Sequence, residues 1–246
     1  MTEVDVVLHP ESPAAFNMEF DLARTQHFTV PMLRLYSWKP FAISLGAHQR
    51  ERDICPEACR ERGYDLVRRP TGGRAILHAD ELTYSVVLPL TTPEEPKRTI
   101  HDIYRDVHLI LLEALKKLGA GADLTFQKSQ TDFRALYKTG QVSMPCFGSS
   151  ARYELMFEGR KIVGSAQKLF THKLFGNVVL QHGSLLLGAG HEGLVEVLNL
   201  NTDEERATMR RTLHEQAATL QECLERRVEW SEAAAAVLQA FGVANR

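Results

Sequence analysis

A single long amphipathic helix, predicted over residues 99–118, divides this 246-residue chain and most constrains how it can fold. Apolar residues recur in it at helical spacing until Gly119, a residue that commonly ends helices. Predicted strands lie on both sides of this helix, and helices predominate after residue 193, which is not the alternating order of a doubly wound fold. We therefore predict an α+β fold with a mixed or antiparallel β-sheet core, helices on one face, and one domain over residues 1–246 that ends in helices at about 203–241.

The strands are predicted from runs of β-forming residues bounded by turn signals. They are expected at 32–38, 42–45, 64–68, 75–78, 82–88, 152–157, 161–167 and 183–187. We expect strands 75–78 and 82–88 to pair with each other, and 152–157 to form a hairpin with 161–167 through Glu158-Gly159. The other helices are expected at 14–25, 56–62, 193–198, 203–227 and 231–241.

Composition excludes several classes of function. The net charge of −2 argues against a surface that binds nucleic acid by bulk positive charge. No apolar run reaches the roughly 20 residues of a membrane span, and the first residues lack the pattern of a secretory signal. The cysteines lack the spacing of a zinc site; they are Cys55, Cys59, Cys146 and Cys223. We expect a cytoplasmic protein that binds no nucleic acid, membrane or metal.

A short loop between two predicted strands combines arginines with two adjacent glycines. Gly72 and Gly73 allow the backbone to approach a ligand closely and expose its N–H groups. Arg69 and Arg74 flank them with guanidinium groups, which suit carboxylate or phosphate. His78, which follows, could position a substrate carbonyl. The alternative is a tight turn with exposed arginines and a histidine that ends a strand.

A cysteine and a lysine further along the chain suggest covalent acyl transfer. Cys146 lies in a loop, and a thiol near a cation such as Lys161 would have a lowered pKa and act as a nucleophile. Lys161 and Gln167 share one face of the predicted strand and could reach a common cavity, with Gly164 leaving room for a chain. His182 is the nearest candidate base. The alternatives are a buried cysteine, a solvated lysine and a structural histidine.

Together these segments resemble the catalytic fold shared by lipoate–protein ligases, octanoyltransferases and biotin–protein ligases. The resemblance extends over about residues 14–200 and is clearest in Arg68–His78, Gly159–Gln167 and Gln181–Leu187. Within this fold, Thr71–Arg74 followed by Glu81–Ser85, and Cys146-Phe147 ahead of Tyr153-Glu154-Leu155, are similar to the Gram-positive-type octanoyltransferases.

This resemblance implies a reaction, its partners and its residues. Octanoyl would move from acyl carrier protein through a thioester on Cys146 to a lysine of a lipoyl domain, such as glycine cleavage H protein or the E2 subunit of a 2-oxoacid dehydrogenase. Lys161 would stabilise the thiolate, no ATP or metal cofactor would be needed, and the enzyme would act as a monomer. Backbone N–H groups near Gly72-Gly73 or Gly164-Ser165 would stabilise the oxyanion. The expected substrate-binding residues are Arg69, Thr71, Gly72, Gly73, Arg74, His78, Gly164, Ser165, Ala166, Gln167, His182 and Gly183.

Three other functions remain open from the sequence. An amidotransferase of the same fold would use the same cysteine and lysine but take octanoyl or lipoyl from another lipoyl domain. An ATP-dependent lipoate ligase would not need Cys146, and such ligases usually carry a third glycine where this chain has Arg74. A protein that only binds acyl groups would form no adduct on the cysteine.

Overall fold

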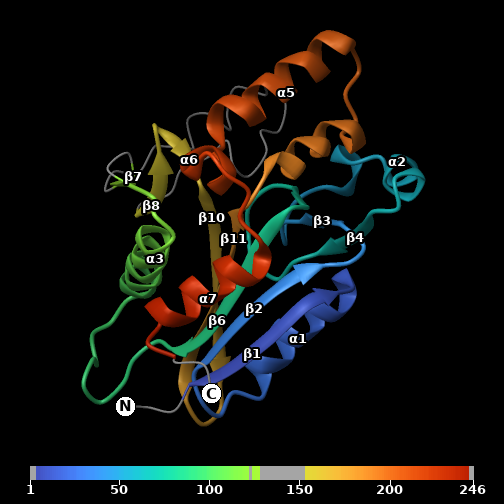
Figure 1. Cartoon of the computed structure of the whole chain (residues 1–246). Helices are drawn as coiled ribbons and strands as arrows, with labels where there is room; N and C mark the ends of the chain where they lie inside the picture. The colour runs from blue at the N-terminus through green and yellow to red at the C-terminus, as the bar shows by residue number, and fades with distance from the viewer. Residues whose placement is uncertain (1–3, 122–123, 128–152, 244–246) are drawn as a thin grey trace.

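The computed structural model describes residues 4–121, 124–127 and 153–243 (Figure 1). Its largest sheet has five strands in the order β1-β2-β6-β11-β10, with β1 parallel to β2 and every other pair antiparallel. These strands are β1 (Asp5–Ser12), β2 (Met32–Trp38), β6 (Glu81–Pro89), β10 (Val163–His172) and β11 (Gly176–Leu186). The predicted α+β class with a mixed sheet is confirmed.

Helices cover both faces of this sheet, so the expectation of helices on one face is wrong. Neighbouring residues on its central strands are both buried, as Met32 and Leu33 on β2 show. Met32 packs with Phe20 of α1 (Ala14–Gln26), and Leu33 packs in a separate core with α3 and α7. Helices α3 (Ile100–Lys117) and α7 (Trp230–Ala240) therefore lie opposite α1 (Figure 1).

A second sheet of three strands has the order β4-β3-β5 and lies next to the first (Figure 1). Its strands are β3 (Ala42–Leu45), β4 (Asp65–Arg68) and β5 (Ile76–His78). The predicted pairing of 75–78 with 82–88 is wrong, because β6 already has β2 on one side and β11 on the other. The chain instead passes between the two sheets at Ala79-Asp80, where Asp80 has a positive φ of 53°.

The third sheet, of order β7-β8-β9, contains the predicted hairpin. Its strands are β7 (Leu124–Gln127), β8 (Glu154–Phe157) and β9 (Arg160–Lys161). Glu158 and Gly159 form the tight turn, with φ values of 49° and 77°. The predicted strand 161–167 is divided at Ile162, whose N–H donates to Leu155 of β8 while its carbonyl accepts from Leu186 of β11. The chain thus leaves the third sheet and enters the first at one residue.

Other differences from the expected elements concern the strand β11 and the C-terminal helices. The strand expected at 183–187 begins at Gly176 and forms a long hairpin with β10. The helix expected over 203–227 is two helices, α5 (Asp203–Gln216) and α6 (Leu220–Leu224), because the Ala218 N–H between them donates to the Lys161 carbonyl. The remaining helices are α2 (Pro56–Glu61) and two 3-10 segments, Glu51–Asp53 and Ala189–Val197. Among the described helices, none combines the length and apolarity that crossing a membrane requires.

Candidate active site

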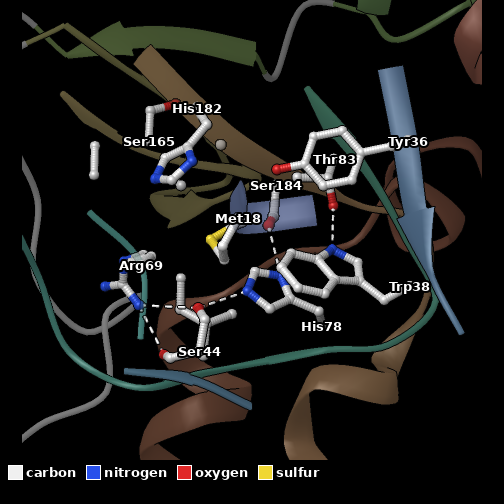
Figure 2. Close-up of a pocket in the computed structure, with 14 residues that line it drawn as sticks. Met18, Tyr36, Trp38, Ser44, Arg69, His78, Thr83, Ser165, His182 and Ser184 are labelled. Atoms are coloured by element: carbon white, nitrogen blue, oxygen red, sulfur yellow. Dashed lines mark hydrogen bonds between the residues drawn. The ribbon is translucent and has the colours of Figure 1, made fainter. Parts of the chain in front are cut away.

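A pocket lies between the five-stranded sheet and the sheet that contains β3 and β5. Figure 2 shows His182 and Ser165 together at one end of it and the stacked rings of Trp38 and His78 at the other. Apolar and aromatic side chains mix with hydroxyl and imidazole groups on its walls. The lining residues are Met18, Tyr36, Trp38, Ser44, Arg69, Ile76, His78, Thr83, Gly164, Ser165, Ala166, His182, Gly183 and Ser184.

His78 is held rigidly as one wall of this pocket. Its ring stacks on Trp38, with ring centres 4.0 Å apart and planes 12° from parallel. Nε2 lies 2.7 Å from Ser44 Oγ, and Nδ1 lies 2.7 Å from Glu81 Oε1. The same Glu81 oxygen accepts hydrogen bonds from two further hydroxyls, those of Thr83 and Ser184. Glu81 is thus the buried centre of this wall, a role that the sequence analysis did not assign.

Arg69 shapes the glycine loop from inside. Only 3% of this residue is exposed. Its guanidinium donates to the carbonyls of Ser44, Gly72 and Arg74 at 2.7, 3.0 and 2.7 Å. The Gly73 carbonyl packs so tightly on Gly46 that a Cβ at Gly46 would lie 2.0 Å from its oxygen. The pocket is lined by Arg69 but not, among the described residues, by the loop residues Thr71, Gly72, Gly73 and Arg74.

The predicted residues of β10 and β11 meet at a close contact between two strands. Gly183 pairs with Ser165, and a Cβ on Gly183 would lie 2.5 Å from both the Gly164 carbonyl oxygen and Ser165 Oγ. Ser165 Oγ lies within hydrogen-bond distance of Tyr84 and His108, at 2.7 and 2.8 Å. The glycine therefore allows the backbone of this strand to form a pocket wall together with Ala166.

The polar network continues behind that wall. Gln181 Nε2 donates to the Tyr84 hydroxyl, and Gln167 Nε2 donates to Gln181 Oε1 and to the Ile100 carbonyl. Burial is the main cause of the lowered pKa of His108, which is about 3, and the nearby charge of Lys161 also lowers it. This imidazole is therefore neutral at physiological pH. The sequence does not single out His108, which falls on the apolar stripe of the long helix.

Lys161 forms a buried ion pair with a residue that the sequence analysis gave no role. Its Nζ lies 2.8 Å from Glu154 Oε1, and the two side chains are only 5% and 2% exposed. The hairpin register places Met156 opposite Lys161, so Glu154 is the diagonal neighbour on the same face. Lys161 lies before the break at Ile162 and does not line the pocket described above, and neither does Gln167, which bonds Gln181 instead. Cys146 lies outside the described residues.

The described residues contain no group of three or more His, Cys, Asp or Glu side chains able to hold a metal ion. The polar groups that the described part of the site offers are imidazole, hydroxyl, guanidinium and backbone groups, together with the nearby Glu154–Lys161 pair.

Comparisons with known proteins identify relatives of this chain in sequence and in fold. The profile of the lipoyl protein ligase A/B catalytic domain matches residues 13–242. The octanoyltransferase LipM of Kyrpidia tusciae is 41% identical over 214 residues, which span 85% of this chain and 75% of that protein. LipM of Moorella thermoacetica is 37% identical, over 96% of this chain and 82% of its own length. Among solved structures, the putative lipoate protein ligase Ta0514 from T. acidophilum, with bound lipoic acid, is similar in fold at a TM-score of 0.69 and 21% identity, over 98% of this chain and 85% of that one.

Proposed function

Because the chain belongs to the lipoyl protein ligase A/B catalytic domain family, we propose that it is an octanoyltransferase that supplies lipoate biosynthesis. The observation that carries the proposal is the similarity to curated octanoyltransferases, which reaches 41% identity and extends over most of the chain. The apolar side chains of the pocket, Met18, Tyr36, Trp38 and Ile76, suit the hydrocarbon chain of an acyl group.

The donor is octanoyl-loaded acyl carrier protein. The Cys146 thiolate attacks the carbonyl carbon of its thioester, a new carbon–sulfur bond forms, and the carrier leaves as its thiol after taking up a proton. The amine of a lysine on a lipoyl domain then attacks the Cys146 thioester. An amide forms, the amine proton is released, and the cysteine sulfur returns to its starting state. Each new acyl bond replaces one of equal or higher energy, so the transfer needs no ATP.

Lys161 supplies the positive charge that favours a thiolate on Cys146. The burial of Lys161 supports this role, since a buried ammonium exerts a stronger field than an exposed one. Glu154 compensates the charge of Lys161 in the protein interior before the thiolate forms.

Glycine cleavage H protein or an E2 lipoyl domain is the acceptor, and the enzyme acts as a monomer in the cytoplasm.

The intact mass of the protein tests this proposal. The protein is incubated without ATP with octanoyl-loaded carrier protein, beside the Cys146→Ala variant and the matched Cys223→Ala variant. We expect wild type and Cys223→Ala to gain one octanoyl group that hydroxylamine removes, and Cys146→Ala to gain none. No adduct on a reduced wild-type protein would reject the mechanism.

The acceptor and the energy source are tested next. Adding a lipoyl domain should move the octanoyl group onto its lysine. Efficient transfer only from an octanoylated lipoyl domain would identify an amidotransferase instead. Activity that requires ATP and free octanoate, and that survives in Cys146→Ala, would identify a ligase.

A further inference from the structure

A chain of buried polar groups runs past one end of the pocket, from helix α1 through His182 to the glycine loop. Arg34 Nη1 donates to Asp21 Oδ1 at 3.0 Å, and both side chains are fully buried. The other Asp21 oxygen, Oδ2, lies 3.6 Å from His182 Nδ1. His182 Nε2 lies 2.6 Å from the hydroxyl oxygen of Thr71. The mechanism proposed above uses none of these three contacts.

Asp21 carries a negative charge although it is buried. Burial alone would raise the pKa of this carboxyl, but contact with His182 and the charge of Arg34 outweigh it and lower the pKa. Hydroxyls of Tyr36 and Ser85 also donate to the carboxylate. A residue so fully engaged is fixed in orientation.

The charge of Asp21 decides which nitrogen of His182 carries the proton. Burial lowers the pKa of His182, so the ring is neutral at physiological pH and holds one proton. The carboxylate favours that proton on Nδ1, the nitrogen that faces it. Nε2 is then an acceptor, and the Thr71 hydroxyl donates to it.

The bond between Thr71 and His182 connects the two sheets that enclose the pocket. Thr71 follows β4 in the three-stranded sheet, whereas His182 belongs to β11 in the five-stranded sheet. The Thr71 carbonyl accepts from the Ala47 N–H, which fixes the backbone on the other side of the residue. The position of the Thr71–Gly73 backbone relative to β11 thus depends on this imidazole.

We propose that Asp21 and His182 are positioning residues that hold the glycine loop in the position relative to β11 that acyl transfer requires. Asp21 orients the imidazole, and the imidazole fixes Thr71 and hence the N–H groups of the two glycines that follow it. His182 acts here as an acceptor for the loop and not as a base for the cysteine. The kinetic part of this inference rests on the proposed octanoyltransferase function.

Paired substitutions separate the two contacts of His182. Asparagine reaches as far as Nδ1 and retains the contact with Asp21, so His182→Asn removes only the bond to Thr71. Thr71→Val removes the same bond from the other side, and Thr71→Ser keeps the hydroxyl. We expect Thr71→Val and His182→Asn each to lower the rate constant of acyl transfer about 10- to 100-fold, and Thr71→Ser to stay near wild type.

The rate is measured in a single turnover and divided by the amount of enzyme that can be acylated, so a smaller folded fraction would not change it. The double variant Thr71→Val/His182→Asn should be no slower than the slower single variant, because both remove one bond. A wild-type rate in Thr71→Val, or losses that multiply in the double variant, would overturn the inference.

A measurement that needs no activity keeps the inference independent of the proposed function. In ¹⁵N-histidine NMR, the His182 signals are those absent from His182→Asn. We expect them to show a proton on Nδ1 in wild type, and the Nε2 resonance to shift in Thr71→Val. A proton on Nε2 would overturn the inference. If wild type transfers no octanoyl but shows the expected tautomer, the proposed function fails and the assigned geometry stands.

Discussion

The glycine loop and the β8–β9 hairpin each hold a buried cation, and they hold it in different ways. The Arg69 guanidinium is surrounded by neutral carbonyls of its own loop and of Ser44. The Lys161 ammonium instead meets a carboxylate, that of Glu154. A planar guanidinium that bonds several carbonyls fixes the positions of those carbonyls and so the shape of the loop. A carboxylate beside an ammonium instead stabilises the positive charge of the ammonium.

This difference suggests a division of labour between the two regions. The glycine loop is held in shape by Arg69, which is also the residue through which it reaches the pocket. The hairpin carries a charge that can interact with a second anion. We therefore expect loss of the hairpin cation to affect chemistry most, loss of its counter-charge to affect stability most, and substitutions at the contact between β10 and β11 to affect stability less.

The largest effect is expected for Lys161→Met, which removes the charge and keeps the length of the side chain. We expect acylation by octanoyl-loaded carrier protein to slow by more than about 100-fold, because the thiolate loses its stabilising cation. The rate is measured by quenched-flow mass spectrometry. Lys168→Met, an exposed lysine on β10, is the matched control and should retain wild-type activity. Equal rates in the two variants would remove Lys161 from the mechanism.

Glu154→Gln should have the largest effect on stability among the variants that keep the Lys161 charge. It leaves the Lys161 ammonium buried without its carboxylate, and breaking one side of a buried ion pair typically costs about 3–5 kcal/mol. The free energy of unfolding is measured in urea. The double variant Glu154→Gln/Lys161→Met should recover much of the loss, since it buries no unpaired charge. A loss below about 1 kcal/mol in the single variant would show that the pair is effectively solvated.

The local elements of this fold were predictable from short-range pattern. Strands 32–38 and 42–45 have the predicted bounds, because runs of β-formers there are separated by Lys39-Pro40. The partner of β5 was not predictable, since the pattern of a strand does not identify its neighbour. Strand β1 was missed because much of it is exposed and it contains Pro10, which weakens the β signal.

The site shows the same limit. Arg69, His78 and His182 were expected near the substrate, and the structure brings all three to one pocket. Asp21, Glu81 and Glu154 were not singled out as site residues. A carboxylate in sequence is most often a surface residue. Only the tertiary fold shows that each of these three is buried against a specific cation or imidazole.

Gly183→Ala tests the wall of the pocket. The new Cβ would lie 2.5 Å from the Gly164 carbonyl oxygen and from Ser165 Oγ, so the strands must separate. We expect a loss of about 1–3 kcal/mol in unfolding free energy, as for overpacking elsewhere. Gly72→Ala on the loop is the matched control, because its Cβ would meet no atom within 4 Å. Thermal and urea unfolding of both variants measure the difference, and equal stabilities would mean that the wall is more pliable than its contacts indicate.

The smallest effect is expected for the pH dependence of stability that His108 of α3 contributes. The pKa of His108 is about 3 in the folded protein and near 6.5 when unfolded, so between these values the unfolded chain binds the additional proton. Stability present above pH 6.5 should therefore fall as the pH is lowered, by about 1 kcal/mol per pH unit from this residue. His108→Gln removes the titrating group and can still hydrogen-bond Ser165. Its unfolding free energy should decline less steeply between pH 6.5 and 5 than that of wild type. Parallel pH profiles would instead assign the acid sensitivity to other buried groups, of which His182 on the loop side is the first to substitute.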